Sequence, residues 1–274
     1  MHKVTIKDKA LWKIYGIQVA VISSAVTLLA FCLPPSSSLR WRITCSAIFI
    51  LALILIFIGN WYNANHKKRA DLSINQTKVH IYIGDLFAQD GLKIIGVNNY
   101  IDLVADDVVV SKNTLHGQFI IRYQKEIDEI KKVIKKSKTL IKDECPQHNQ
   151  RNKPSYANGS CVLYGEYVLA VLTRFDNQNK AVTSIQEYVQ FWMSFWKNID
   201  ALYNSRTLNI PILGAGQTRF RDEIPAKQEL LEIALWTLKE SGFHNNYRDK
   251  SINFVVYEND AREIDFYRIQ KIFE

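Results

Sequence analysis

The fold of this chain is decided by the stretch Leu208-Asn209-Ile210-Pro211-Ile212-Leu213-Gly214-Ala215-Gly216-Gln217-Thr218-Arg219-Phe220. Its first half is apolar and predicts a short buried strand that runs into a Gly-x-Gly turn. Glycines after a strand let the backbone turn sharply and point N–H groups at an anion. A helix is predicted from about Pro225, because the fixed φ of proline suits a first helical turn. Strand, glycine turn and helix in this order predict a phosphate site in an α/β fold; the alternative is a tight turn without a ligand.

Two common phosphate motifs are excluded at this position. A P-loop needs Gly-Lys followed by Ser or Thr, and the stretch has no such ending. The dinucleotide-binding fingerprint needs a third glycine where Arg219 stands. A phosphate site here would therefore belong to another α/β class.

The net charge of +8 lies entirely in the first quarter of the chain. Residues 1–70 contain nine basic residues and one acidic residue, and the remainder contains 26 of each. A nucleic-acid-binding domain would carry its basic surface on the folded part. We therefore expect no nucleic-acid partner.

The four cysteines, Cys32, Cys45, Cys145 and Cys161, do not have the paired spacing of a zinc site or a redox couple. Two of them lie in apolar segments, which disfavours a disulfide framework. We expect plain thiols and no metal site.

Two apolar runs predict a transmembrane hairpin within residues 1–66. The spans cover about 14–33 and 43–60, close to the length that crosses a bilayer, and the polar turn Pro34-Pro35-Ser36-Ser37-Ser38 separates them. A cleaved signal peptide fits less well, because a second span follows the first. Basic residues before the first span and after the second outnumber those in the turn. By the positive-inside rule, we expect a multi-pass protein in contact with membrane lipid, with both termini in the cytoplasm.

The first span carries small residues along one face. At 100° per residue they fall within an arc of roughly 120°. Small residues let transmembrane helices approach closely, so this arc predicts a packing face. The alternative is that such residues are simply frequent in spans. The residues of the face are Gly16, Ala20, Ser23, Ser24 and Thr27, with Ala30 at its end.

Residues 67–77 are predicted to form a basic juxtamembrane linker, and 78–274 a single α/β domain. Predicted strands lie at 79–83, 93–97, 167–173, 208–213 and 252–257. Predicted helices run from about 114 to 142, from the capping box Ser184-x-x-Glu187, and from 225 to Ser241 before Gly242. Alternating strands and helices favour a three-layer domain with a mixed, largely parallel sheet.

Three motifs of this domain resemble the macrodomain family of ADP-ribose-binding modules. They are Gly84-Asp85-Leu86-Phe87, Ile94-Ile95-Gly96-Val97-Asn98-Asn99 and Ile210-Pro211-Ile212-Leu213-Gly214-Ala215-Gly216. The resemblance implies that Asp85 takes the adenine amino group, that the asparagines lie beside the distal ribose, and that the glycine loop takes the diphosphate. An aromatic such as Phe220 can cover a ribose or base. No cofactor is implied, and the ligand would be an ADP-ribose derivative. The implied ligand-binding residues are Asp85, Leu86, Phe87, Asn98, Asn99, Gly214, Ala215, Gly216, Gln217, Thr218, Arg219 and Phe220.

More narrowly, the membrane hairpin with Gly-Asp-Leu-Phe, residues 96–100 and residues 111–119 is similar to the transmembrane-macrodomain effectors of the bacterial Thoeris anti-phage system. The resemblance implies that a TIR-domain protein makes an ADP-ribose-type signal from NAD, expected to be a histidine conjugate. Binding of the signal would make the effector oligomerise in the bacterial inner membrane, disrupt it and arrest the cell. The chain would then be a sensor and not an enzyme.

Two alternatives remain. Hydrolytic macrodomains carry a glycine run after the asparagine, whereas 102–114 contains no glycine, Leu115-His116 precedes Gly117, and Arg219 replaces the last glycine of the phosphate loop. A membrane-tethered ADP-ribosyl hydrolase would use Asn98, Asn99 and an aspartate from Asp102, Asp106 or Asp107 to place a water. The second alternative is an anchored scaffold with an empty pocket.

Overall fold

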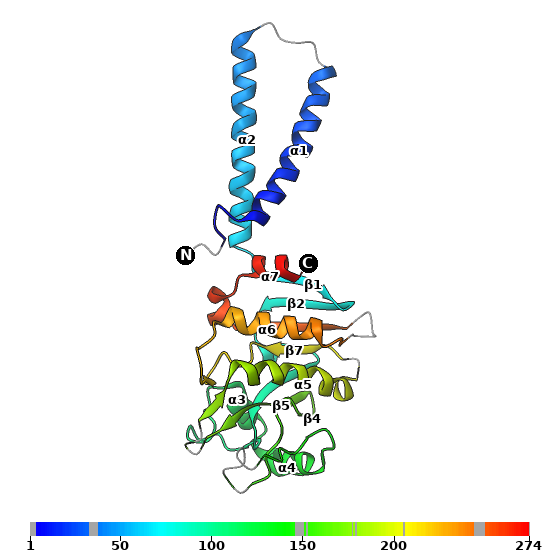
Figure 1. The fold of residues 1–274 in the computed structure, drawn as a ribbon, viewed down its shortest axis with the longest axis vertical. Helices are drawn as coiled ribbons and strands as arrows, with labels where there is room; N and C mark the ends of the chain where they lie inside the picture. Colours follow the sequence, from blue (N-terminus) through cyan, green and yellow to red (C-terminus); the bar gives the residue numbers. More distant parts are fainter. Residues whose placement is uncertain are drawn as a thin grey trace. The chain divides into compact units, whose positions relative to one another are not determined.

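The computed structural model of the chain describes residues 4–32, 38–145, 151, 153–176, 178, 180–204, 206–243 and 250–273 (Figure 1). The chain divides into two compact units, which are described separately below. The first consists of Met1–Lys68 together with Asp265–Ile272, and the second of Arg69–Ile264 with Phe273–Glu274.

The first unit is built around two long apolar helices, α1 (Lys9–Cys32) and α2 (Leu39–Asn65). Both are long and apolar enough to cross a membrane, and the most apolar window of each contains no buried residue. The first helix begins before the apolar run because the Asp8 carboxylate accepts a hydrogen bond from the Leu11 N–H at 2.9 Å. Most of the predicted turn, residues 34–37, lies outside the described residues.

Polar and aromatic contacts join these two helices. The Asn60 amide donates to the Gln18 side chain at 2.5 Å, and the Phe57 ring lies 4.8 Å from Trp12 and 5.2 Å from Tyr15 between centroids. In lipid, such hydrogen bonds and close packing hold helices together. The hairpin expected from the sequence therefore has specific internal contacts.

The C-terminal helix α7 (Phe266–Phe273) was not predicted. Tyr267 packs with Val4 and Ala64 in a small apolar cluster, and Lys67 donates to the Gln270 side chain. The sequence predicts a single domain over 78–274, whereas Asp265–Ile272 forms part of the compact unit of the hairpin. This contact joins residues about 200 positions apart in sequence, a pairing that no local pattern reveals.

The second unit contains one mixed sheet in the order β1-β2-β9-β7-β3-β5-β6-β8, with β4 paired to β5. The five strands from β2 to β5 in this order run parallel, and the pairs β1/β2, β4/β5 and β5/β6 are antiparallel. The strands are β1 (Arg69–Ile74), β2 (Thr77–Ile83), β3 (Leu92–Asn98), β4 (Cys161–Tyr164), β5 (Tyr167–Phe175), β6 (Ala181–Thr183), β7 (Leu208–Pro211), β8 (Arg219–Phe220) and β9 (Ser251–Val256). The predicted mixed, largely parallel sheet is confirmed.

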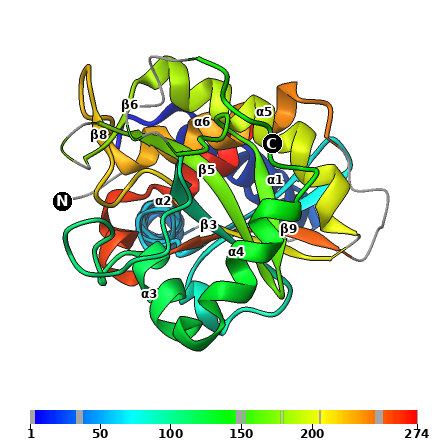
Figure 2. The ribbon, with the colours of Figure 1, turned by 90° about the horizontal axis from the view of Figure 1, so that it is seen from below.

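Helices cover both faces of this sheet (Figure 2). On one face lie α5 (Ile185–Tyr203) and α6 (Lys227–Glu240), and on the other lie α3 (Leu115–Arg122) and α4 (Ile127–Lys136). The aromatic stripe of α5 is buried, as expected of packing residues, and Trp192 meets Phe254 of β9. On the α3 side, Ile95 and Val97 pack with Phe119. The predicted three-layer α/β architecture is confirmed.

The segment 67–77, predicted as a linker, instead contains β1. Ala70, Leu72 and Ile74 are buried at every second position, the pattern of a strand with one face on the core. The basic run Lys67-Lys68-Arg69 led to the prediction of a linker, although the residues after it alternate as in a strand. The strand pairs antiparallel with β2 through a turn in which Asn75 and Gln76 both have positive φ.

The single helix predicted over 114–142 is also wrong. It breaks at a 3₁₀ turn, Gln124–Glu126, between α3 and α4, and it ends at Lys136. The Tyr123 ring at the break packs edge-on against Tyr164 and Tyr167 of neighbouring strands. Beyond the end, the Thr139 hydroxyl donates to the Cys161 carbonyl at 2.7 Å. Tertiary contacts thus override the helical pattern.

Gly159 should be intolerant of any side chain. It has φ +80°, and an added Cβ would lie 2.5 Å from Ser194 Cβ and 2.8 Å from the Phe191 carbonyl oxygen. Gly165 is a matched control, because it has φ +59° but nothing within 4 Å of an added Cβ. Gly165→Ala should cost about 1–2 kcal/mol of unfolding free energy for the left-handed backbone. Gly159→Ala should cost about 1–3 kcal/mol more for overpacking.

The measurement is the thermal unfolding of both variants of the full-length protein in detergent, followed by tryptophan fluorescence. Equal losses in the two variants would show that the contact between Gly159 and α5 does not have the described geometry.

Candidate functional site

A cavity of about 970 Å³ opens at the carboxyl ends of the parallel strands. Its wall is contributed by the ends of β2, β3, β5 and β7, the loop 107–116, and the segment after β9. The carboxyl edge of a parallel sheet is where α/β folds bind ligands. Its volume lies at the upper end of the roughly 300–1,000 Å³ usual for small-molecule sites.

The glycine loop after β7 forms part of this wall, as predicted. Gly214 has φ +83°, and an added Cβ would lie 3.3 Å from the Tyr188 ring. The Tyr188 hydroxyl donates to the Leu213 carbonyl at 2.8 Å and holds the chain at the point where it turns. Gly216 differs, because nothing lies within 4 Å of an added Cβ there. Gly214 is therefore required by the fold. Gly216 is not, and because it has no side chain it presents only its backbone to the cavity.

Arg219 and Phe220 take opposite sides of the short strand β8, which pairs with β6. Successive strand residues point to opposite faces, so Arg219 is exposed and lines the cavity together with Gln217 and Thr218. Phe220 is buried, with its ring centroid 5.9 Å from that of Tyr188. Phe220 is absent from the cavity wall and packs in the core, and its contact with a ligand stays a prediction.

Asp85, Leu86 and Phe87 all line the cavity where β2 ends. The Asp85 Oδ1 accepts from the Phe87 N–H at 3.0 Å and caps the 3₁₀ turn Leu86–Ala88. Leu86 is buried in the core, and the Arg122 guanidinium lies 4.2 Å from the centroid of the Phe87 ring. The Asp85 carboxylate is exposed, so it is placed where a ligand amino group could reach it.

The two asparagines at the end of β3 are separated by the structure. The Asn98 Oδ1 accepts from the Tyr100 N–H at 2.9 Å and the Asp102 N–H at 3.3 Å. These bonds hold a turn in which the β-branched Ile101 has φ +49°, a costly conformation. Asn98 also lines the cavity.

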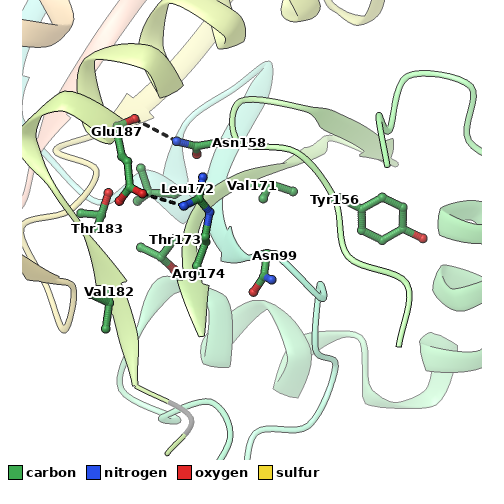
Figure 3. Close-up of a pocket in the computed structure, with 10 residues that line it drawn as sticks. All are labelled: Asn99, Tyr156, Asn158, Val171, Leu172, Thr173, Arg174, Val182, Thr183 and Glu187. Carbon is green, nitrogen blue, oxygen red and sulfur yellow. Dashed lines mark hydrogen bonds and ion pairs between the residues drawn. The ribbon is translucent and has the colours of Figure 1, made fainter. Parts of the chain in front are cut away.

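Asn99 points elsewhere and is not part of the cavity wall. Its Oδ1 accepts from the Phe175 N–H at 3.0 Å, and its side chain lines a crevice too narrow for water (Figure 3). In that crevice the Arg174 guanidinium meets the Glu187 carboxylate at 2.6 Å. In this structure Asn99 ties the end of β3 to β5, and its contact with a ligand stays a prediction.

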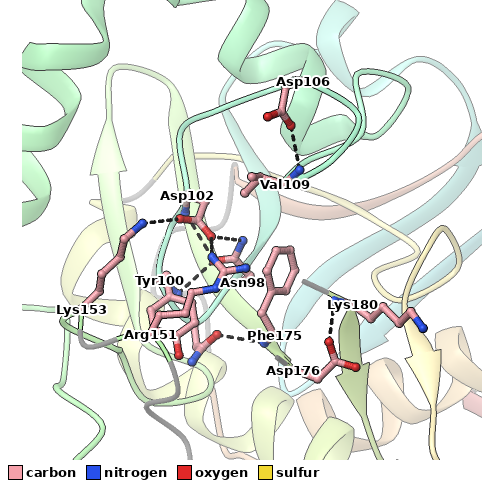
Figure 4. A network of polar contacts seen from close by, with 11 residues as sticks. Asn98, Tyr100, Asp102, Asp106, Val109, Arg151, Lys153, Phe175, Asp176 and Lys180 are labelled. Carbon is pink, nitrogen blue, oxygen red and sulfur yellow. Dashed lines mark hydrogen bonds and ion pairs between the residues drawn. The ribbon is translucent and has the colours of Figure 1, made fainter. Parts of the chain in front are cut away.

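The three candidate aspartates are all held by partners within the protein. Asp102 is only 8% exposed and pairs with Arg151 at 2.7 Å and Lys153 at 3.5 Å (Figure 4). Arg151 in turn lies over the Tyr100 and Phe175 rings, 4.9 and 5.0 Å from their centroids. This network fixes Asp102 outside the cavity wall.

Backbone N–H groups hold the other two carboxylates. Asp106 accepts from Val109 at 2.7 Å and Val108 at 2.9 Å, and these bonds lower the pKa of its carboxyl group. Asp107 accepts from the Lys112 N–H at 2.9 Å, which lowers its pKa in the same way. Of the three aspartates, Asp107 lines the cavity.

His116 is a cavity residue that the prediction missed. It lies in the first turn of α3, is 7% exposed, and its Nε2 has no hydrogen-bond partner among the described residues. Burial lowers the pKa of the imidazole to about 4, although the Asp102 charge and backbone oppose the shift. One signal in the sequence points to it, because residues 102–114 contain no glycine and a bulky, polar His116 precedes Gly117.

No group of three or more His, Cys, Asp or Glu side chains is placed to hold a metal ion in the part of the chain that the structure describes. Cys45, Cys145 and Cys161 are free thiols.

A parallel-centred sheet between two helix layers, with a glycine loop at its carboxyl edge, defines a macrodomain-like module. The family described as Thoeris protein ThsA, Macro domain, matches residues 79–257. This chain belongs to that family. It is 30% identical over 238 residues to the Thoeris protein ThsA of Bacillus amyloliquefaciens (strain Y2), covering 83% of this chain and 80% of the relative.

Solved macrodomains of Oceanobacillus iheyensis are more distant. The structure with ADP is 12% identical, covers 75% of this chain and 95% of its own, and superposes with a TM-score of 0.41. The structure with MES bound is also 12% identical, covers 75% of this chain and 96% of its own, and has a TM-score of 0.42.

The stability of this domain should fall as the pH drops from about 6.5 to about 4. In that window the unfolded chain binds a proton at His116 that the native ring, with a pKa of about 4, does not. Unfolding free energy is then lost at up to about 1.4 kcal/mol per pH unit, or about 3 kcal/mol in all. The variant His116→Phe lacks this contribution.

Melting temperatures of wild type and His116→Phe, taken in steps from pH 7.5 to pH 4, give the comparison. The variant should show the shallower decline. Parallel curves would mean that the imidazole is not buried in its neutral form.

Proposed function

We propose that this chain is a membrane-anchored sensor and effector of Thoeris anti-phage defence that binds an ADP-ribose-derived signal without turning it over. The observation that carries the proposal is the cavity at the carboxyl edge of the sheet. In its wall, Gly216 has no side chain to keep a phosphate from the backbone. Family membership supports the same ligand class.

The order of the strands suits the parts of ADP-ribose. Asp85 follows β2, the glycine loop follows β7, and Asn98 ends β3, in the sheet order β2-β9-β7-β3. An adenine amino group at Asp85 would thus be followed by a diphosphate at the loop N–H groups. The cation of Arg219 lines the same cavity and would add charge pairing to the diphosphate. The terminal ribose would lie at the end of β3.

Binding without hydrolysis is supported by the three aspartates. A carboxylate that places or deprotonates water must be within reach of the substrate. Asp102 is occupied by Arg151 and Lys153 away from the cavity wall, and Asp106, also outside the wall, accepts backbone hydrogen bonds. Asp107 lines the cavity, but its carboxylate is held by the N–H and the ammonium group of Lys112. Release of ADP-ribose from ADP-ribosylated protein by the purified chain would instead favour the tethered hydrolase.

In this proposal a TIR-domain protein makes the signal from NAD, with histidine as the group joined to ADP-ribose. The sensor would be a multi-pass protein of the bacterial inner membrane, with both termini in the cytoplasm. Asp260 lines the cavity, and five residues later, at Asp265, the chain enters the compact unit of the hairpin. A change at the cavity therefore has a short covalent path to the membrane helices, which would then oligomerise and disrupt the membrane.

Gly216→Val should abolish close approach of the loop to phosphate. The new side chain meets nothing within 4 Å and φ there is not left-handed, so the fold should be unaffected. We expect the affinity for ADP-ribose to fall roughly thirtyfold, about 2 kcal/mol, because charge-assisted hydrogen bonds are lost. Gly216→Ala should lie between the variant and wild type.

Isothermal titration of the full-length protein in nanodiscs with ADP-ribose measures this effect, and an unchanged melting temperature is the control. Normal affinity in a folded Gly216→Val protein would reduce the loop to a tight turn. Failure of wild type to bind ADP-ribose would remove the proposed function.

Gly16→Leu or Ala20→Leu should block assembly in the membrane. Gly16, Ala20, Ser24 and Thr27 are exposed in the described hairpin, so α2 leaves most of the small face uncovered. Leucine keeps the span apolar but pushes neighbouring backbones apart. Val21→Leu is the matched control, because Val21 is 64% exposed and lies about 140° around the helix from Gly16.

We expect the two face variants to reach the membrane and bind ligand, yet not to cross-link or admit membrane-impermeant dye when the signal is supplied. Val21→Leu should behave as wild type. Full dye uptake in Gly16→Leu cells would make the small face incidental.

A further inference from the structure

The helix α7 lies at one end of the hairpin. Tyr267 of α7 packs with Val4 and Ala64 in an apolar cluster. Val4 is itself held there, because its N–H donates to the Asn65 side chain and its carbonyl accepts from the Trp61 indole, both at 2.9 Å. The segment before α1, the end of α2 and α7 therefore meet at the same end of this compact unit.

The outer side of α7 is basic. Arg268, Lys271 and Ile272 are exposed, and at 100° per residue they lie within an arc of about 100°. The other side of the helix is buried and consists of Phe266, Tyr267, Ile269 and Phe273. A helix with one apolar side and cations on the other has the composition of a helix that lies on a membrane surface.

Basic residues of the other two segments extend this surface. The described residues of this end, 4–13, 60–68 and 265–272, include seven basic residues and two acidic ones. Both acidic side chains accept a backbone N–H at the start of a helix, Asp8 from Leu11 and Asp265 from Arg268, each at 2.9 Å. A positive excess beside a membrane span attracts anionic headgroups. The basic residues are Lys7, Lys9, Lys13, Lys67, Lys68, Arg268 and Lys271, and all except Lys67 are exposed.

Large apolar side chains are exposed at the same end. Ile6, Trp12 and Tyr62 are each at least 49% exposed, and the Trp12 indole donates to the Ile6 carbonyl at 2.7 Å. Trp and Tyr at the ends of membrane helices favour the headgroup region. A soluble anion would need only the cations. Cations together with exposed apolar rings fit a lipid, which has a charged headgroup and an acyl chain.

We propose that α7 is a membrane-surface element. Its Arg268 and Lys271, together with the basic residues at the start of α1 and the end of α2, bind the headgroups of anionic phospholipids. This inference rests on the proposed insertion of the hairpin into a membrane. It goes beyond that insertion because it assigns a class of lipid, and a contact made by a helix that follows the ligand-binding domain in sequence.

The test is native mass spectrometry of the full-length protein in detergent. The protein is titrated with phosphatidylglycerol or with phosphatidylcholine of the same acyl chains, which differ in the net charge of the headgroup. Wild type should bind phosphatidylglycerol more tightly. Arg268→Gln combined with Lys271→Gln should weaken phosphatidylglycerol about tenfold and change phosphatidylcholine by less than about twofold, because each cation near the headgroups contributes to the attraction.

Lys132→Gln combined with Lys135→Gln is the matched control. It removes two exposed charges at the same i, i+3 spacing, but from α4 of the other compact unit. This variant should keep the preference of wild type. An equal loss of preference in the two double variants, or an unchanged preference in the α7 variant, would overturn the role of α7.

Titration of the same samples with ADP-ribose separates this inference from the proposed function. Both double variants should bind ADP-ribose as wild type does, because none of the four residues lines the cavity. Failure of wild type to bind ADP-ribose would remove the proposed signal and leave the lipid contact in place. A wild-type protein that stays in solution without detergent would overturn both the membrane anchor and the lipid contact.

Discussion

The site depends on how the chain leaves β7. At Gly214 the backbone must take φ +83° beneath the Tyr188 ring, and the Tyr188 hydroxyl holds the preceding carbonyl at 2.8 Å. A residue with a side chain would meet both the backbone strain and the ring. Since α5 supplies Tyr188, the loop is positioned by the core and not by its own sequence alone. Its remaining residues are then free to face the cavity.

At the β3 end of the cavity, the wall is held in place by the Asp102 carboxylate, which does not itself line the cavity. Asp102 lies between Arg151, Lys153 and the Asn98 amide, and its own backbone holds His116. A buried carboxylate is stable only when it is paired in this way. The network therefore keeps the Asp102 carboxylate out of the cavity wall, where the neutral His116 ring lies instead.

The two long apolar helices would obey different physics in a membrane. Lipid is as apolar as leucine, so hydrophobic burial would not hold them together there. The Gln18–Asn60 bond and the rings around Phe57 fasten one side of α1 to α2. The small residues of α1 lie largely outside this contact and remain available to another helix.

The sequence by itself determined the features that depend on local pattern. Apolar runs of bilayer length, alternating strands and helices, and a glycine turn after a strand each follow from a few neighbouring residues. These patterns were enough to predict the two long apolar helices, the three-layer fold, and the cavity positions of Asp85, Asn98 and the loop 214–219.

Only the tertiary structure decided which side chains of those motifs line the cavity. Asn99 and Phe220 belong to the right motifs but turn inward, because Phe175 and Tyr188 offer partners from distant segments. The strand β1, the break after α3 and the docking of α7 likewise depend on residues far along the chain. His116 became a candidate only when the fold buried its ring and placed the residue in the cavity wall. Long-range packing sets these orientations, and no local pattern carries that information.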